Sequence, residues 1–129
     1  MEKIPEIKRI LIIEDEAEVL HFASRVLELE GYHVLQAEDA EEGMRLVREG
    51  RISLLLLDLR LPRHDGWVVL QQIKSKPELE AIPVIVFTAS AGVSQREKAL
   101  SMGAADYLVK PLSAASLREA VTRILHQKR

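Results

Sequence analysis

Carboxylates end two of the most apolar segments of this 129-residue chain. Segment 53–58 reads SLLLLD, so four leucines run directly into Asp58. Segment 9–14 reads RILIIE and is followed at once by Asp15 and Glu16. Burial of a charge costs free energy unless the charge is paired, so acidic residues at these positions need cationic partners or a function.

Two further apolar segments end at a hydroxyl and at an ammonium group: PVIVFT ends at Thr88, and ADYLVK ends at Lys110. Taken alone, these residues have ordinary structural explanations. Asp15 can cap a helix, and an aspartate after a strand, such as Asp58, often forms a turn. If the four segments are parallel strands, however, their carboxyl ends meet at the edge of the sheet where ligands bind. Several acids, a hydroxyl and an ammonium group would then share one site.

This set of side chains suits phosphoryl transfer. Crowded carboxylates raise one another's pKa unless a cation lies between them, and Mg²⁺ prefers carboxylate and phosphate oxygens. Lys110 and Thr88 can hold phosphate oxygens by charge and by a hydrogen bond. A carboxylate can attack phosphorus and become an aspartyl phosphate, while the cation and the lysine neutralise charge. Among the acids at this edge, we predict that Asp58 is the nucleophile.

The elements that must position these residues alternate along the chain. Apolar runs are mostly continuous, which is typical of strands covered on both faces; they lie at 9–14, 33–37, 53–58, 83–88 and 105–110. Amphipathic stretches lie between and after them, with apolar positions at Val19, Phe22, Ala23, Val26 and Leu27, at Met44, Leu46 and Val47, at Val68, Val69 and Ile73, at Ala99, Leu100 and Met102, and at Leu117, Ala120, Val121, Ile124 and Leu125. This alternation predicts an α/β fold with one open parallel sheet and right-handed crossovers.

Residues that favour helix ends agree with this pattern. Gly31, Gly50 and Gly103 stand where helices should stop before the next strand, and Ser113 is expected to cap the last helix. No linker or low-complexity tract divides the chain, so we expect residues 1–129 to form a single domain.

Composition excludes several classes of function. The chain has no cysteine, which excludes disulfides, a thiol nucleophile and a zinc–thiolate site. Hydrophobic content of 47% and a net charge of −2 are typical of a globular protein and give no electrostatic reason for direct binding to nucleic acid or to an anionic membrane. Since the N-terminus does not resemble a signal peptide and no apolar run is long enough to span a bilayer, we expect a cytoplasmic protein.

Four motifs occur in a fixed order between about Arg9 and Leu125: LIIEDE, LLLLDLRLPRHDGW, IPVIVFTAS and GAADYLVKP. Together they resemble the receiver domain of two-component response regulators. The resemblance implies a flavodoxin-like, doubly wound sheet with strand order 2-1-3-4-5 and five flanking helices. It also implies a phosphoacceptor that catalyses only its own phosphorylation and dephosphorylation, and is not otherwise an enzyme.

The resemblance assigns roles to the acidic residues. Asp58 would accept a phosphoryl group from a phosphohistidine on a histidine kinase or a histidine phosphotransfer protein. Glu14, which stands where many members have aspartate, would form an acidic pocket with Asp15. Mg²⁺ would be bound by Asp15, by Asp58 and by the main-chain carbonyl of Arg60.

Other residues would hold the phosphoryl group and transmit the signal. Lys110 and Thr88 would contact phosphoryl oxygens, and the Lys110–Pro111 bond matches one that family members usually hold cis. Movement of Thr88 would let Tyr107, the switch aromatic, rotate and change the surface formed by the fourth helix, fifth strand and fifth helix. That surface would signal to an output partner or effector domain. The chain would be a stand-alone receiver, or part of a DNA-binding regulator or hybrid kinase.

Alternatives remain at the level of sequence. A flavodoxin-like flavin carrier needs a loop rich in glycine, serine or threonine after the first strand, but this loop reads EDEAE. An independent phosphatase would need room for a substrate pocket or cap domain. A degenerate receiver that serves only as a protein-interaction module is the main alternative. His21, His33, His64 and His126 lack metal-ligand spacing, so we expect surface or core-edge positions, and Trp67 is expected to pack at the start of the third helix.

Overall fold

Five parallel strands form one sheet in the computed structural model, which describes residues 6–61, 66–89 and 92–126. The strands are β1 (Arg9–Ile13), β2 (His33–Ala37), β3 (Leu54–Asp58), β4 (Val84–Thr88) and β5 (Asp106–Val109). They pair in the order β2-β1-β3-β4-β5, which places β3 at the centre. The predicted strand order is therefore confirmed, and each predicted run differs from its strand by at most one residue at either end.

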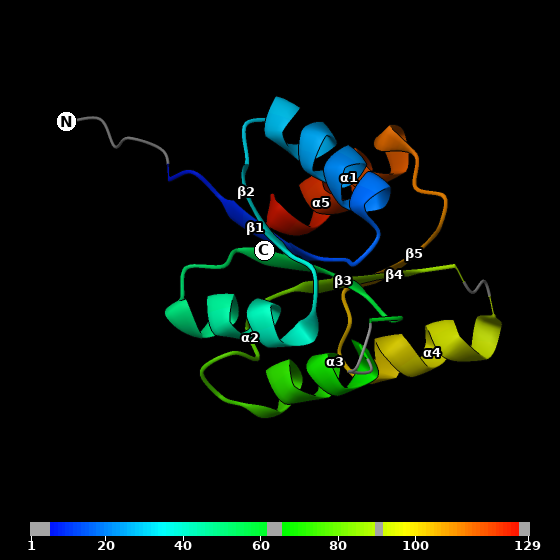
Figure 1. Ribbon diagram of the computed structural model, residues 1–129. Coiled ribbons are helices and arrows are strands. Elements are labelled where there is room, and N and C mark those ends of the chain that lie inside the picture. The colour runs from blue at the N-terminus through cyan, green and yellow to red at the C-terminus, as the bar shows by residue number, and fades with distance from the viewer. Residues whose placement is uncertain (1–5, 62–65, 90–91, 127–129) are drawn as a thin grey trace.

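Helices follow the strands in turn and cover both faces of the sheet. They are α1 (Ala17–Leu29), α2 (Ala40–Glu49), α3 (Gly66–Ser75), α4 (Val93–Ser101) and α5 (Ala114–Leu125). Figure 1 shows α1 and α5 on one face, and α2, α3 and α4 on the other. This is the doubly wound arrangement expected from the sequence. No helix within the described ranges is long and apolar enough to cross a membrane.

The sheet separates two apolar layers, because successive strand side chains point to opposite faces. On β3, Leu54 and Leu56 pack with residues of α1 and α5, whereas Leu55 and Leu57 pack with residues of α2, α3 and α4. All four leucines are fully buried. A strand that is covered on both faces needs apolar side chains at every position, which explains the continuous run before Asp58.

Two residues that the helical patterns place among the apolar positions are exposed. Phe22 is 42% exposed and Val68 is 43% exposed. On α1, the buried side chains include Leu20, Ala23 and Leu27, so Phe22 lies at the margin of the stripe that faces the sheet. Phe22 instead lines an open apolar hollow with Pro111. The pattern predicted the helix correctly but included Phe22 in its buried face, although Phe22 lies outside that face.

The expected helix ends are present. Gly31, Gly50 and Gly103 have positive φ angles of 93°, 93° and 105°, a conformation that glycine adopts at little cost. The Ser113 side chain accepts a hydrogen bond from the amide of Ser116, which confirms the predicted cap of α5. The N-cap position of α1, in contrast, is occupied by Glu16 and not by Asp15. The Lys110–Pro111 bond is cis, as the resemblance implies.

Candidate functional site

The register of the sheet brings polar residues to one edge. Ile13 of β1 lies opposite Leu57 of β3, so Glu14 and Asp58 follow at the same level. The Lys110 amide donates to the carbonyl of Thr88 over 2.8 Å, which places the first residue after β5 beside the last residue of β4. The predicted convergence of strand ends is therefore observed.

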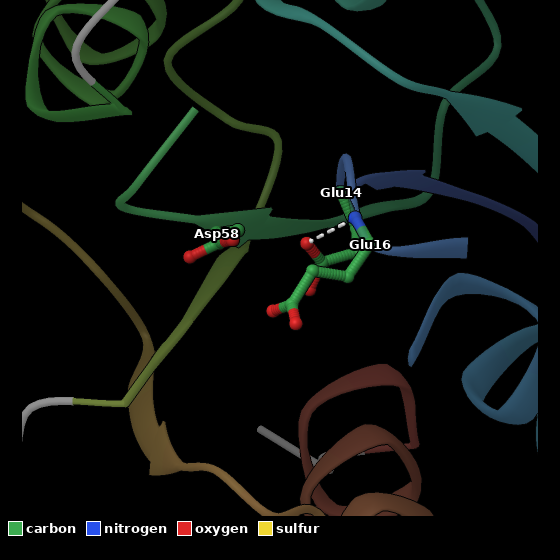
Figure 2. A group of neighbouring side chains, drawn as sticks. All are labelled: Glu14, Glu16 and Asp58. Carbon is green, nitrogen blue, oxygen red and sulfur yellow. Dashed lines mark hydrogen bonds between the residues drawn. The ribbon is translucent and has the colours of Figure 1, made fainter. Parts of the chain in front are cut away.

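One ammonium group contacts three carboxylates at this edge. The Lys110 Nζ atom lies 2.7 Å from Glu14 Oε1, 2.8 Å from Glu16 Oε1 and 3.2 Å from Asp58 Oδ2. Figure 2 shows Glu14 and Glu16 next to the end of β1 and Asp58 at the end of β3. One oxygen from each carboxylate lies within 4.8 Å of the others, so the three acids form one group.

Glu14 is the most constrained member of this group. Its side chain is fully buried, and burial raises its pKa from 4.5 to about 7, against the opposing effect of the Glu16 amide and Lys110. The Oε2 atom accepts a hydrogen bond from the Glu16 amide over 3.0 Å. The Oε1 atom lies close to Lys110 but off the direction of a good hydrogen bond. A buried carboxylate oxygen without such a bond is suited to bind a cation.

Glu16 and Lys110 stabilise each other's charge. The Lys110 ammonium hydrogen-bonds to Glu16 and lowers the pKa of that carboxyl group, whose side chain is 62% exposed. Burial by itself would lower the pKa of Lys110, but its contacts with the carboxylates of Glu14 and Glu16 and the charge of Asp58 raise this pKa above its usual range. Lys110 is therefore a permanent cation in this site.

Asp58 is held between main chain and lysine. Its side chain is 2% exposed, Oδ1 accepts a hydrogen bond from the Arg60 amide over 3.0 Å, and Oδ2 accepts one from Lys110. The returning chain at Gly66 packs directly on this segment: a Cβ atom there would lie 2.5 Å from the main-chain oxygen of Asp58 and 2.6 Å from Cα of Leu59. Gly66 thus permits the close approach that encloses Asp58.

Comparison with known proteins identifies the family. The model of the response regulator receiver domain matches residues 10–122. The chain belongs to this family. Its relatives include the probable transcriptional regulator ycf27 of Porphyridium aerugineum, 34% identical over 93% of this chain and 49% of that protein. The chain thus spans about half the length of the curated relatives it matches.

Solved receiver structures agree with the fold. A CheY-like receiver domain protein from Methanospirillum hungatei JF-1 has a TM-score of 0.86 and 30% identity, with 95% of this chain and 96% of that chain covered. The Mn²⁺-bound form of response regulator Rcp1 has a TM-score of 0.84 and 26% identity, with 95% and 97% covered. The protein is a receiver of two-component signalling.

Most predicted residues of the receiver site meet, but Asp15 does not join them. Glu14, Asp58 and Lys110 are in contact, and Arg60 adds its amide to Asp58 while its side chain is exposed. Asp15 is exposed, and the group of neighbouring carboxylates contains Glu16 in its place. A role for Asp15 as a cation ligand stays a prediction.

The two predicted switch residues lie on the α4 side of the receiver. Thr88 is buried and, by strand alternation, shares a face with Val86, which pairs with Tyr107 on β5. Tyr107 is also buried, and its hydroxyl lies 3.5 Å from Oε1 of Gln95 on α4. The structure therefore connects the edge near Asp58 to α4 through these two strands.

Sequence reasoning placed Glu16 among the acids that follow the first strand but assigned no specific role to it, and it gave no site role to Gly66. An available signal for Glu16 is the period of two in an extended chain: Ile12, Glu14 and Glu16 point the same way if extension continues past β1. The φ and ψ angles of Glu16, −81° and 112°, are indeed extended. The contact at Gly66 joins residues that the loop separates, so no local pattern indicates it. His21, His33 and His126 are exposed as expected, whereas His64 lies outside the described residues.

Proposed function

We propose that this receiver accepts a phosphoryl group on Asp58 from a phosphohistidine of a histidine kinase or phosphotransfer protein. The observation that carries the proposal is the position of Asp58, buried at the end of the central strand with a permanent cation 3.2 Å from its Oδ2 atom. A buried carboxylate with one oxygen held by an amide and the other by an ammonium group is oriented for attack on a tetrahedral phosphorus.

In the proposed transfer, an oxygen of Asp58 forms a bond to phosphorus. The phosphorus–nitrogen bond of the donor breaks, and its electron pair goes to the imidazole nitrogen of the donor histidine. Lys110 then neutralises negative charge on the phosphoryl oxygens, and Thr88 donates a hydrogen bond to one of them. The Arg60 amide keeps the Asp58 carboxylate in place during the transfer.

We further propose that the reaction depends on Mg²⁺. Its donors would be the carboxylates of Glu14, Asp15 and Asp58, together with the main-chain carbonyl of Arg60. Three close carboxylates and a buried Glu14 oxygen without a good hydrogen bond fit a small, hard cation. The ion would supply charge neutralisation at the phosphoryl oxygens. Rcp1, a similar receiver, has been described in an Mn²⁺-bound form.

The proposed output is a change in the surface made by α4, β5 and α5. A phosphoryl group adds about −1.5 to −2 charges, so groups that can donate hydrogen bonds must move toward it. Thr88 is such a donor, and its movement would free space that Tyr107 can enter. The partner at this surface would be an output protein or effector domain, since relatives of about twice this length are named as transcriptional regulators. We propose a cytoplasmic setting and a single domain over residues 1–129, with no direct binding of this domain to nucleic acid or membrane.

Intact-mass measurement with a small acyl phosphate tests the assignment. Wild-type protein with Mg²⁺ should gain one phosphoryl group, and Asp58→Asn should gain none. Omission of the divalent cation should reduce the yield sharply. Modification of Asp58→Asn to the wild-type extent would contradict the assignment of Asp58, and an unmodified wild-type protein would favour a receiver that acts only as an interaction module.

A further inference from the structure

Three carboxylates surround the ammonium group of Lys110, which donates hydrogen bonds to Glu16 and Asp58. An ammonium group carries three protons, and Lys110 Nζ faces three carboxylates, at 2.7 Å in Glu14, 2.8 Å in Glu16 and 3.2 Å in Asp58. If Lys110 is to contact a phosphoryl group, as the proposed function requires, the phosphoryl oxygen must compete with these carboxylates for the ammonium group.

The three carboxylates differ in how easily they can be released. Glu14 is fully buried, so loss of its cation would leave an unpaired charge inside the protein. Asp58 is the acceptor itself and remains beside Lys110 throughout the transfer. The Glu16 side chain is 62% exposed, and water can solvate its carboxylate as soon as it rotates away. Glu16 is the contact that can be exchanged at least cost.

We propose that Glu16 is a positioning residue that holds Lys110 in the unphosphorylated receiver and competes with the incoming phosphoryl oxygen for its ammonium group. This inference rests on the proposed phosphorylation of Asp58. The ion pair with Glu16 would hold Lys110 in place in the unphosphorylated state, and this ion pair would break on phosphorylation. The side chain would therefore slow the gain of a phosphoryl group and not assist it.

The local structure allows this role to be tested without damage to the helix. Glu16 is the N-cap residue of α1, but its side chain makes no capping hydrogen bond. Its main-chain amide is held separately by Glu14 Oε2. Glu18, in the first turn of α1, is an exposed acid of equal charge that lines the hollow beside Lys110 without being among its ion-pair partners in the described structure. Glu18→Gln is therefore a matched control for charge.

The experiment measures the rate of phosphorylation by acetyl phosphate in the whole chain, with Mg²⁺ saturating for each variant. We expect Glu16→Gln to react about two- to fivefold faster than wild type, the range given by loss of one exposed ion pair. Glu16→Asp keeps the charge, but its side chain is one methylene shorter and should hold Lys110 less well, so this variant should also react faster. Glu18→Gln should match wild type at high salt, where long-range charge effects are screened.

A spectroscopic measurement separates the contact from a structural effect. In wild-type protein, the carboxyl carbon resonance of Glu16 should move toward that of the exposed Glu18 when beryllofluoride, a tetrahedral mimic of the phosphoryl group, occupies the site. The proposal is overturned if this resonance does not move, if Glu16→Gln reacts no faster than wild type, or if Glu16→Asp keeps the wild-type rate. An unmodified wild-type protein would instead refute the proposed function, and this inference with it.

Discussion

At the scale of single residues, the site is dominated by competition for one cation. Glu14 shows the cost of this arrangement, because its carboxylate is fully buried and only partly compensated by the Lys110 ammonium and the Glu16 amide. The raised pKa of about 7 means that the folded protein holds a proton on Glu14 where the unfolded chain, with a pKa near 4.5, has lost it. Stability must therefore depend on pH between these values.

The sign of this dependence gives a prediction for cation-free buffer. Below pH 4.5, Glu14 is neutral in both states; from there to about pH 7 the unfolded chain loses its proton first, so the free energy of unfolding should fall as pH rises. We expect a fall of roughly 1 to 2 kcal/mol, because Lys110 shares the charge. Glu14→Gln should lack this component in urea denaturation, so the variant should gain stability relative to wild type over that interval. A constant difference between the two proteins would contradict the prediction.

At the scale of elements, the start of α3 and the pair β4–β5 determine what the site can do. Gly66 begins α3 at a point where its Cα lies against the main chain of Asp58 and Leu59. The main-chain amide of Gly66 also donates to the carbonyl of Leu59 over 3.1 Å. A side chain of any size at this position must push the start of α3 away from the main chain of Asp58 and Leu59.

Gly66→Ala should therefore destabilise the receiver and disturb Asp58 together. The clash is with main-chain atoms, which cannot rotate away, so we expect a loss of about 1–3 kcal/mol in the free energy of unfolding and slower phosphorylation. Gly31→Ala is the control, because a Cβ atom there meets nothing within 4 Å and the cost comes from the positive φ angle alone. Urea denaturation and intact-mass kinetics should show loss of stability in both variants but slower phosphorylation only in Gly66→Ala. Equal phosphorylation rates would show that the loop adapts.

The link from Thr88 to Tyr107 gives a second prediction at this scale. Thr88→Ala should still accept a phosphoryl group on Asp58, but the NMR resonances of Tyr107 and of α4 should no longer respond to it, because the movable hydroxyl is absent. Thr122→Ala, on the exposed surface of α5, should respond as wild type does. Among the described residues of α4 only Ala99 is fully covered, so this helix is the element expected to shift most easily. Wild-type resonance shifts in Thr88→Ala would exclude the coupling.

How far the sequence could predict these elements depends on the range of the interactions. Strand positions and their order were predictable, because continuous apolar runs and four family motifs lie in the chain itself. Asp58 and Lys110 could be placed together by the rule that parallel strand ends share an edge. The contact between Glu16 and Lys110 was not predicted, since it depends on how far the extended conformation continues after β1. The contact of Gly66 with Asp58 and Leu59 is a tertiary contact, which no local pattern encodes.

At the scale of the whole molecule, the protein is expected to unfold as one unit. The strands of the single sheet contribute side chains to both apolar layers, so neither layer can persist without the sheet. Trp67, the only tryptophan, is half-buried on α3 with the Lys98 ammonium 4.4 Å from its ring centre. Its fluorescence therefore reports on the layer of α3 and α4, whereas far-ultraviolet circular dichroism reports on all helices.

The two signals should give the same urea midpoint and the same free energy of unfolding. Leu70→Ala removes a fully buried side chain from the α3 layer. It should lower the free energy of unfolding by about 2–5 kcal/mol, and by the same amount in either signal. Loss of Trp67 fluorescence at a lower urea concentration than loss of helix would indicate that the α3–α4 layer unfolds separately and would contradict a single cooperative unit.

The sheet also separates the layer of α1 and α5 from the layer of α2, α3 and α4. By strand alternation, Asp58 lies on the side of Leu56, with α1 and α5, whereas Thr88 lies on the side of Val86, with α4. A group attached to Asp58 lies at the carboxyl edge of the sheet, and Thr88 ends the neighbouring strand. A charged group attached to Asp58 on the α1 side can therefore act on Thr88, on the α4 side, without any rearrangement of either apolar core. Both apolar cores can stay tightly packed while the conformational change is transmitted along the carboxyl edge of the sheet.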